Sequence, residues 1–574
     1  MSTVGANPRV RPVARASSAR SPILPILILL LAFFLRAASL TLDRFHADEA
    51  LYSGWALRIR DGDPFLLDVP VDKPPLYLFA LAASFRTFGS SELAARLPNL
   101  AAGMLNLALL YALARRLYGP RTARWATFVL ACSPYSILFA RTAFTDTTLV
   151  TWTLAALYAA TGGRWLWAGI AMGLALATKQ HAVILYPLVF AVGWMALTYS
   201  ACGGSYPEGI PVGQSTAGPG KAKRWRVFLS LLGFAPILAL VTWWDAQRWE
   251  IRPGYWQQST LSYGGLAWAA PAEWGGRLLE WLGWARYLFG SPLLYATFGL
   301  GIVLLMLWNW GLLPARGGSY QRVSCGQSTA SSDRAAHPPD CPQNTLRYGP
   351  ARAQNKILDT LLAAYLLAYI LLHTVAGFSV WDRYLLPLAP LVALLVGRMV
   401  SIVIPECSYR ESRNPVTPAL RAGASVPGIS SRESRITRIV LPLTLSLLLL
   451  LSGTRAARNG YPVGGDHWAY QGLDEIASYL KTNAPPDAVL YHHWLRWHYT
   501  YYLHGTPFEL RYWESGEHLL RESRRSPDHA QYIVLPTWRT EDPAIEGLSF
   551  EPLLSPQRRD GSVALTLYRV VVDP

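Results

Sequence analysis

The chain has 574 residues, of which 52% are hydrophobic and only 15% carry a charge, and its formal net charge is +16. Soluble domains average about 25% charged residues, so this composition argues against a soluble globular protein. The basic excess could indicate nucleic-acid binding, but Arg and Lys lie mostly between long apolar blocks, as in the cytoplasmic loops of membrane proteins. We therefore expect a polytopic membrane protein with no nucleic-acid partner.

Apolar segments of about 20 residues predict eleven transmembrane helices, and the short fourth and fifth segments leave a count of about ten to thirteen open. The predicted spans are 22–41, 93–116, 123–140, 147–161, 165–179, 181–199, 226–244, 284–309, 357–378, 384–403 and 437–453. Residues 1–21 are basic and contain no small-residue cleavage site before the first span. They are expected to be a cytoplasmic N-terminus followed by a retained signal anchor.

The loops between these spans fall into two sets that differ in charge. The basic set is predicted to be cytoplasmic and comprises 117–124, 162–164, 200–225, 310–356 and 404–436. The opposite set is richer in Asp and Glu and comprises 42–92, 141–146, 245–283 and the tail from 454. The positive-inside rule then predicts a plasma-membrane protein with residues 22–453 in the membrane domain and residues 454–574 outside the cytoplasm.

Three of the basic loops are expected to be disordered, at 200–224, 310–356 and 404–436. They are rich in Ser, Gly, Pro and Arg, lack apolar periodicity, and two of them share the string GQSTA. The five cysteines predict no disulfide framework, because the tail contains none of them.

The tail reads as a small α/β domain. Residues 472–485 and 495–503 have helical patterns, whereas 487–493, 531–536 and 563–572 alternate as strands do. The fold class predicted from the whole chain is thus a polytopic α-helical membrane protein with a small extracytoplasmic α/β domain at its C-terminal end.

The first acidic loop carries the strongest chemical signal. Asp48 and Glu49 follow the first span within HADEALYSGWALRI, whose apolar residues predict a short helix with both acids in its first turn. Acids after a span can simply mark the interface. Charges beside a membrane are nevertheless costly, which favours a function for this pair.

A second cluster in the same loop is Asp72 and Lys73, directly before Pro74 and Pro75. Proline restricts the residue before it to extended geometry, so Lys73 should point in a fixed direction. A lysine at the outer headgroup level suits a phosphate, although it could equally be an ordinary anchor whose amine reaches the interface.

Further charges are predicted at the same face of the membrane, contributed by loops far apart in the chain. They are Arg96 at the start of the second span, Asp146 beside the fourth, Lys179 at the end of the fifth, and Arg383 with Tyr384 before the tenth. Their convergence predicts one site for an anionic, lipid-linked substrate.

Five short motifs in this order resemble the GT-C glycosyltransferases that use polyprenyl-phosphate sugars. The branch is that of the protein O-mannosyltransferases and the lipid A aminoarabinose transferases. The motifs are DE at 48–49, KPP at 73–75, ARLPN at 95–99, TD at 145–146 and RYLLPLAP at 383–390. The resemblance covers residues 22–200 well and residues 357–400 by the last motif alone.

The resemblance implies a role for each matching residue. Asp48 would be the catalytic base, with Glu49 in support and Asp146 orienting substrate or acceptor. Lys73 and Arg383, grouped here with Arg96, would bind the donor phosphate, and Asp72, Tyr384 and Lys179 would support the site. Relatives carry a glutamate near a metal where this chain has Asp72, which leaves a divalent cation open. No histidine partner can be placed, so no metal ligand is predicted.

The implied function is an inverting transfer of a sugar from a polyprenyl-phosphate carrier to a protein, lipid or glycan acceptor at the outer face. One alternative is a flippase of lipid-linked sugars, which would place charges at the bilayer midplane and show internal symmetry. Another is an oligosaccharyltransferase-like enzyme, which would carry a WWD motif in its soluble domain. Here WWD occurs at 243–245, in the seventh span, where chance explains it. The tryptophans of 245–283 fit interfacial helices or substrate stacking.

Overall fold

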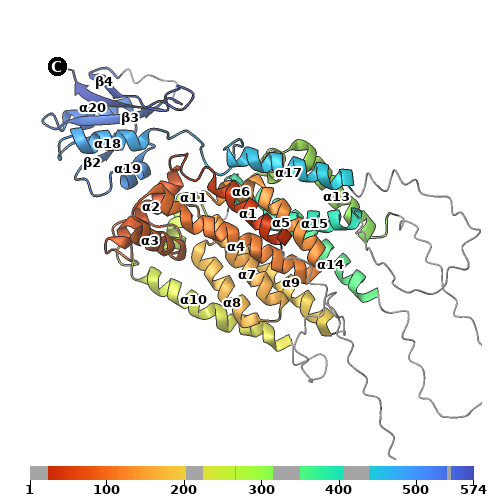
Figure 1. Ribbon diagram of the computed structural model, residues 1–574. Coiled ribbons are helices and arrows are strands. Elements are labelled where there is room, and N and C mark those ends of the chain that lie inside the picture. The colour runs from red at the N-terminus through yellow and green to blue at the C-terminus, as the bar shows by residue number, and fades with distance from the viewer. Residues whose placement is uncertain are drawn as a thin grey trace, which may run out of the picture.

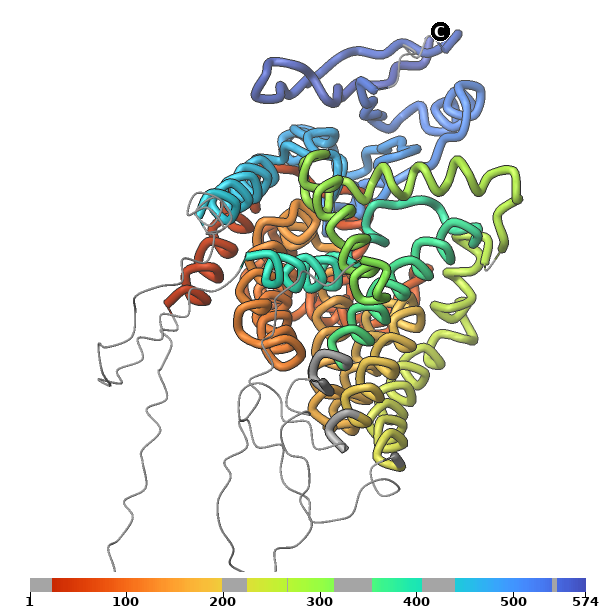
Figure 2. Tube along the Cα trace, turned by 90° about the vertical axis from the view of Figure 1, so that its right-hand side faces the viewer, coloured from red at the N-terminus to blue at the C-terminus, as the bar shows by residue number. Residues whose placement is uncertain are grey.

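The computed structural model describes residues 23–201, 224–265, 267–313, 349–404, 439–538 and 545–573. A bundle of helices forms the larger part, and a region with a β-sheet, residues 461–573, lies at one end of it (Figure 1). In the view turned by 90°, this blue C-terminal region again lies above the bundle (Figure 2). The loops predicted to be disordered fall almost entirely outside the described residues. The described residues within them are 200–201, 224, 310–313, 349–356 and 404, and residues 349–356 belong to helix α14.

The bundle is built from apolar helices whose backbone groups bond internally, as a hydrocarbon environment requires. Within the described ranges, five helices are long and apolar enough to cross a membrane: Glu92–Tyr118, Trp225–Ala246, Pro292–Asn309, Gln354–Val375 and Asp382–Val403. Five shorter apolar helices are Ile23–Ala37, Leu76–Phe88, Trp165–Thr178, Ala182–Thr198 and Leu441–Ala457. The number of spans predicted from the sequence, eleven, stays a prediction.

The principal helices are α1 (Ile23–Ala37), α4 (Glu92–Tyr118), α5 (Pro120–Cys132), α7 (Asp146–Thr161), α8 (Trp165–Thr178), α9 (Ala182–Ala201), α10 (Leu229–Ala246), α13 (Pro292–Asn309), α14 (Gly349–Val375), α15 (Ala389–Val403) and α17 (Leu441–Ala457). The predicted loop 42–92 contains two helices, α2 (Ala47–Arg60) and α3 (Leu76–Phe88). The first was expected. The second was not, because its 13 residues are too few for a straight span.

Two predicted spans are broken by proline. The segment 123–140 divides into α5 and α6 (Pro134–Phe139), and 284–309 divides into the end of α12 (Trp274–Ala285), a 3₁₀ turn (Arg286–Leu288) and α13. Pro134 and Pro292 each occupy the first position of a new helix, where the missing N–H costs nothing. Likewise, residues 382–388 form a 3₁₀ helix (Asp382–Leu388) before α15 begins.

Helices α8 and α10 approach each other closely through glycine. A Cβ on Gly169 would lie 1.9 Å from the Ser230 carbonyl oxygen, and one on Gly233 would lie 2.2 Å from the Leu166 carbonyl oxygen. Small residues at such crossings allow two backbones to meet, which is how helices associate where no water drives them together.

The C-terminal region contains a five-stranded sheet in the order β2–β1–β3–β5–β4. The strands are β1 (Val489–His492), β2 (Glu509–Tyr512), β3 (Gln531–Pro536), β4 (Leu548–Leu554) and β5 (Leu565–Val572). The first three are parallel and β5 is antiparallel to both of its neighbours. Helices α18 (Leu473–Asn483) and α19 (Arg496–Tyr502) cover one face, and α20 (Gly516–Arg524) covers the other.

The sequence predicted α18, α19, β1, β3 and β5 at these places. It missed β2 and β4, whose sequences ELRY and LSFEPLL lack a clean apolar alternation. A small mixed sheet is thus present in this part of the chain, and its standing as a separate α/β domain stays a prediction.

This unit packs directly on the loop that carries Asp48. Helix α19 lies against α2, the imidazole of His498 lies 3.0 Å from the Phe45 carbonyl oxygen, and Arg44 pairs with Asp474 at 3.0 Å. His498 is buried, and that burial chiefly lowers its pKa to about 3, so this histidine belongs to the packed core between the two parts. The sheet region therefore holds the start of α2 from above.

Candidate active site

The first turn of α2 sends its two acids in different directions. His46 caps the helix by accepting the Asp48 amide at 3.1 Å, and the Glu49 carboxylate accepts the His46 amide at 3.0 Å. This reciprocal pair is a capping box with His in place of Ser or Thr. Because neighbouring residues of a helix project about 100° apart, fixing Glu49 on one side leaves Asp48 facing another.

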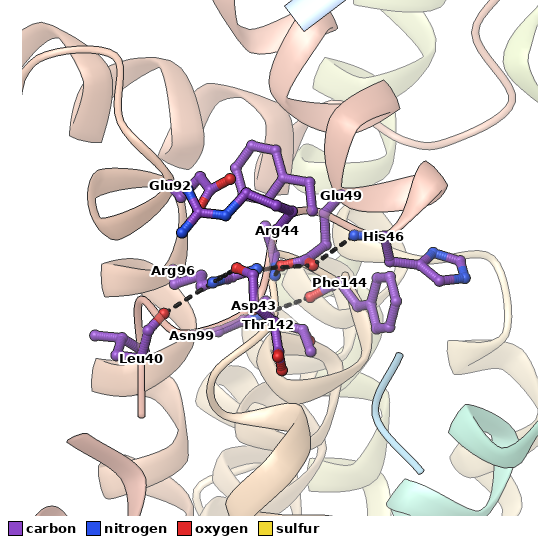
Figure 3. Close-up of polar contacts among 12 residues, drawn as sticks. Leu40, Asp43, Arg44, His46, Glu49, Glu92, Arg96, Asn99, Thr142 and Phe144 are labelled. Carbon is purple, nitrogen blue, oxygen red and sulfur yellow. Dashed lines mark hydrogen bonds and ion pairs between the residues drawn. The ribbon is translucent and has the colours of Figure 1, made fainter. Parts of the chain in front are cut away.

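Glu49 lies in a saturated buried network (Figure 3). Its carboxylate takes two hydrogen bonds from Arg96, at 3.1 and 3.2 Å, and one from the Ala143 amide at 2.7 Å. Arg96 also donates to the carbonyl oxygens of Leu40 and Asp43, at 2.8 and 2.9 Å. The two side chains are 4% and 3% exposed. The network joins α2 to α4 and to the turn before α7.

Three other acids each pair with a cation. Asp48 accepts a hydrogen bond from Arg383, Asp72 pairs with Lys73 at 2.5 Å, and Asp146 pairs with Lys179 at 2.6 Å. Five separate segments supply them: the first turn of α2, the 72–75 segment, the start of α7, the end of α8 and the 3₁₀ helix before α15. The charges of Lys73 and Arg383 both act on Lys179, so the three cations form one cluster.

The cluster lines a cavity of about 380 Å³. Lys73, Lys179 and Arg383 contribute the charge, and the remaining wall is mostly aromatic and apolar. Its members include Val183, Ile184, Trp256, Tyr263, Phe378, Trp381 and Tyr384. A cationic end beside an apolar wall matches a ligand with an anionic head and a hydrocarbon body. Glu49 and Arg96 do not line this cavity, and Asp48, Asp72 and Asp146 reach it only through the cations with which they pair. The roles expected for these residues stay predictions.

Each cation of the cluster lies over an aromatic ring. The Lys73 amine is 4.9 Å from the centre of Tyr263, the Lys179 amine is 4.9 Å from that of Tyr384, and the Arg383 guanidinium is 4.2 Å from that of Trp381. Tyr384 in turn stacks on His181 at 5.0 Å. These cation–π contacts add to the ion pairs with Asp72, Asp146 and Asp48 in holding the three cations at the cavity.

Sequence reasoning missed Tyr263 and Trp381, whereas His181 was expected beside Lys179 at the same face. The only signals for them are the position of Trp381 beside Asp382 and Arg383, and the aromatic content of the 245–283 loop. That loop contains α11 (Tyr255–Tyr263) and α12. Trp268 is 73% exposed, as interfacial residues are, whereas Trp256 lines the cavity. Both accounts of the tryptophans thus describe part of the loop.

Asp48 is held in its charged form. Burial by itself raises the pKa of the Asp48 carboxyl, but the charges of Arg383, then His46 and Lys73, outweigh it and lower that pKa well below its usual value. The Nε of Arg383 is buried and has no acceptor among the described residues. The guanidinium therefore has a donor to spare for a second anion.

The residues around Asp72 do not fit a metal site. Its carboxylate pairs with the amine of Lys73, a competing cation, and no three His, Cys, Asp or Glu side chains cluster within the described ranges. The WWD string is structural, since Asp245 accepts the Tyr255 amide at 2.8 Å and the Trp249 indole at 2.9 Å.

Comparisons with known proteins place this arrangement among membrane glycosyltransferases. Residues 72–201 match the family model of dolichyl-phosphate-mannose-protein mannosyltransferases. The chain is 33% identical over 127 residues to YkcB of Bacillus subtilis (strain 168), a provisionally named mannosyltransferase. That match spans 21% of this chain and 18% of YkcB, less than a fifth of the relative's length.

Two solved structures match nearly the whole chain. ArnT from Cupriavidus metallidurans in the apo state covers 95% of it with a TM-score of 0.55 at 14% identity, and the match includes 97% of ArnT. ArnT bound to undecaprenyl phosphate gives 0.53 at 15% identity, with the same coverage of both chains. The chain has the GT-C fold. A GT-C chain with these apolar helices is a multi-pass membrane protein.

Proposed function

We propose that this GT-C protein is an inverting glycosyltransferase that moves a sugar from a polyprenyl-phosphate carrier to a hydroxyl group of an acceptor. The observation that carries the proposal is the cavity in which three cations meet an apolar wall, with Asp48 paired to one of those cations. The match of residues 72–201 to mannosyltransferases and the likeness to ArnT support it, because both concern proteins that handle lipid-phosphate substrates.

Lys73, Lys179 and Arg383 would hold the donor phosphate, and the apolar wall would take the first isoprene units. Asp48 would accept the proton of the acceptor hydroxyl as its oxygen attacks C1 of the sugar. The new O–C1 bond forms while the C1–O bond to phosphate breaks, and the electron pair leaves with polyprenyl phosphate. The cations stabilise the charge that grows on this leaving group, and attack from the opposite side inverts C1.

The strength of Asp48 as a base depends on its ion pair with Arg383. A carboxylate neutralised by a guanidinium is a weak base, as the lowered pKa of Asp48 indicates. A bound phosphate competes for Arg383 through charge-assisted hydrogen bonds and weakens its hold on Asp48. The pKa of Asp48 then rises, so the base gains strength once the donor is in place.

The remaining acids receive supporting roles. Glu49 and Arg96 would position Asp48 by fixing the first turn of α2, and neither would touch substrate. Asp146 would set the place of Lys179 and Asp72 that of Lys73, whose segment is further held by the hydrogen bond from Gln180 to the Asp72 carbonyl oxygen at 2.7 Å. No step of this mechanism requires a metal. We propose that the site lies at the outer face of the plasma membrane, with a cytoplasmic N-terminus, because the basic loops alternate along the sequence with the loops that supply the site residues.

The test is a donor panel. Purified full-length protein in liposomes is given one polyprenyl-phosphate sugar at a time together with a cell-envelope extract, and the release of polyprenyl phosphate is measured by mass spectrometry. We expect one donor to be consumed by the native protein and not by Asp48→Asn. Asp68→Asn is the matched control, because Asp68 lies in the same loop with its side chain 81% exposed. If no donor is consumed above the Asp48→Asn background, the proposed function is wrong.

A further inference from the structure

A second cavity, of about 790 Å³, lies within the sheet region. Its walls are the segment 466–470, Trp494, Trp538 and the turn at 558–562. We propose that this cavity binds a saccharide acceptor and presents one of its hydroxyl groups to Asp48. The inference rests on the proposed function and adds the chemical class of the acceptor to it.

Aromatic side chains from three segments line this second cavity. Trp468 and Tyr470 come from the segment after α17, Trp494 follows β1, and Trp538 follows β3. Tyr470 and Trp538 meet edge to face with 5.5 Å between ring centres, and Trp538 remains 45% exposed. Indole faces open to solvent in a concave site suit a ligand with apolar C–H faces and a polar rim, which is how a pyranose presents itself.

Trp468 adopts a conformation that a bulky residue rarely takes. Its φ is +66°, in the left-handed region that favours glycine. Arg558 holds it there by donating to the Trp468 carbonyl oxygen at 3.0 Å, and the Arg559 guanidinium lies 5.9 Å from the ring centre. Such strain persists where the surrounding structure enforces it, and it clusters at binding sites. Here it keeps an indole at the cavity wall.

The charges of the cavity favour a neutral, hydroxyl-rich ligand. Asp466 and Asp560 supply acceptors, and Arg558 and Arg559 supply donors. A hydrocarbon chain would take these four charged groups out of water, which is costly even for those that already have protein partners. A polyanion would meet two carboxylates. Hydroxyl groups, which both donate and accept, can satisfy either sign.

The cavity is joined to the first turn of α2. Asp466, at its edge, pairs with Nε2 of His46 at 3.3 Å, and Nδ1 of the same ring accepts the Asp48 amide at 3.1 Å. Burial, followed by the nearby carboxylates of Asp466 and Asp48, raises the pKa of the Tyr470 phenol. Tyr470 therefore lies near both carboxylates. Asp48 thus touches the donor cavity through Arg383 and this second cavity through its own cap.

The test measures binding of a printed array of plant, fungal and bacterial envelope glycans to the full-length protein in detergent. We expect selective binding that falls at least about tenfold in Trp538→Ala and in Trp468→Ala, a loss typical of one stacked ring. Trp310→Ala is the matched control, because Trp310 is also exposed, at 62%, and lies outside the cavity. Absence of glycan binding by the native protein, or equal binding by Trp538→Ala, would overturn the proposal.

Kinetics separate this proposal from the proposed function. With the glycan selected on the array as acceptor, Trp538→Ala should raise the acceptor KM about tenfold and leave the donor KM unchanged. If the native protein binds the glycan but consumes no donor, the proposed function fails and the glycan site stands. If it transfers sugar to a peptide or a lipid with equal KM in Trp538→Ala, the acceptor assignment fails alone.

Discussion

Asp48 and Glu49 are neighbours in the chain, yet the arginines that they contact differ in how fully their hydrogen-bond donors are used. Both oxygens of the Glu49 carboxylate accept hydrogen bonds, and all three nitrogens of the Arg96 guanidinium donate, to Glu49 and to two carbonyl oxygens. Around Asp48, Arg383 keeps an unused donor beside a cavity. The difference teaches that a buried charge pair builds architecture when it is saturated, and can do chemistry when it is left incomplete.

Removing the Asp48 charge tests the reactive side of this comparison and should have the largest effect. Asp48→Asn is expected to lower the rate of sugar transfer by about 10²–10⁴-fold, the usual contribution of a general base. The measurement is kcat in liposomes, with donor binding recorded alongside. Folding should be unaffected, and the thermal unfolding midpoint provides that control. A variant that turns over at the native rate would remove Asp48 from catalysis.

Breaking the saturated network should act on stability instead. Glu49→Gln or Arg96→Gln leaves a buried charge without its partner, which costs about 3–5 kcal/mol. We expect a lower midpoint of thermal unfolding in detergent for both variants, together with an unchanged donor KM for the protein that remains folded. A changed donor KM at native stability would place Glu49 or Arg96 in the donor site after all.

The cations of the cavity should affect the donor more than the acceptor. Lys73→Ala, Lys179→Ala and Arg383→Gln each remove a charged hydrogen bond of about 1.5–3 kcal/mol. That loss corresponds to a rise of about 10- to 100-fold in the donor KM, with the acceptor KM unchanged. Arg116→Gln is the control, because that arginine donates to the Tyr158 carbonyl oxygen and the Thr161 hydroxyl at the end of α7 away from Asp146. An unchanged donor KM in all three variants would contradict the phosphate site.

The smallest expected effect is a shift of the pH profile. The pKa of Asp48 is lowered, so the carboxylate stays charged, and the ion pair stays intact, from neutral pH down through the usual carboxyl range near about 3.9. Both are lost only as the pH falls through the lower value. We expect kcat/KM, which reports the free enzyme, to be flat from pH 7 to about pH 5.

Arg383→Gln sharpens this prediction. Without the guanidinium, burial dominates and raises the pKa of Asp48, so the acid limb of kcat/KM should move to higher pH. An unmoved limb in this variant would show that Arg383 does not set the proton affinity of the base.

Much of this arrangement can be predicted from the sequence. The helical bundle, the short helix of Asp48, and the strands β1, β3 and β5 follow from apolar periodicity, because that pattern can be read within each segment of the sequence. Lys73, Lys179 and Arg383 were expected at one face, and the structure brings all three to one cavity. Periodicity and charge are local properties of the sequence, so these elements and charged residues can be predicted without knowing their distant partners.

What the sequence could not provide depends on partners far along the chain. Nothing local separates Asp48 from Glu49, because the difference is made by Arg383 and Arg96, which lie 335 and 47 residues away. Tyr263 contacts Lys73, 190 residues earlier in the chain, and no sequence motif predicts this contact. Helix α3 was missed because 13 apolar residues fall short of a span, and the breaks at Pro134 and Pro292 divide segments whose hydropathy is continuous.

The most direct measurement is an experimental structure of the protein with undecaprenyl phosphate bound. The account predicts the phosphate in the cavity, within hydrogen-bonding distance of Lys73 and Arg383, with the Asp48 carboxylate released from its full pairing with Arg383 and the Glu49–Arg96 network unchanged. A phosphate bound elsewhere, or one held by Arg96 while Asp48 and Arg383 stay paired, would contradict it.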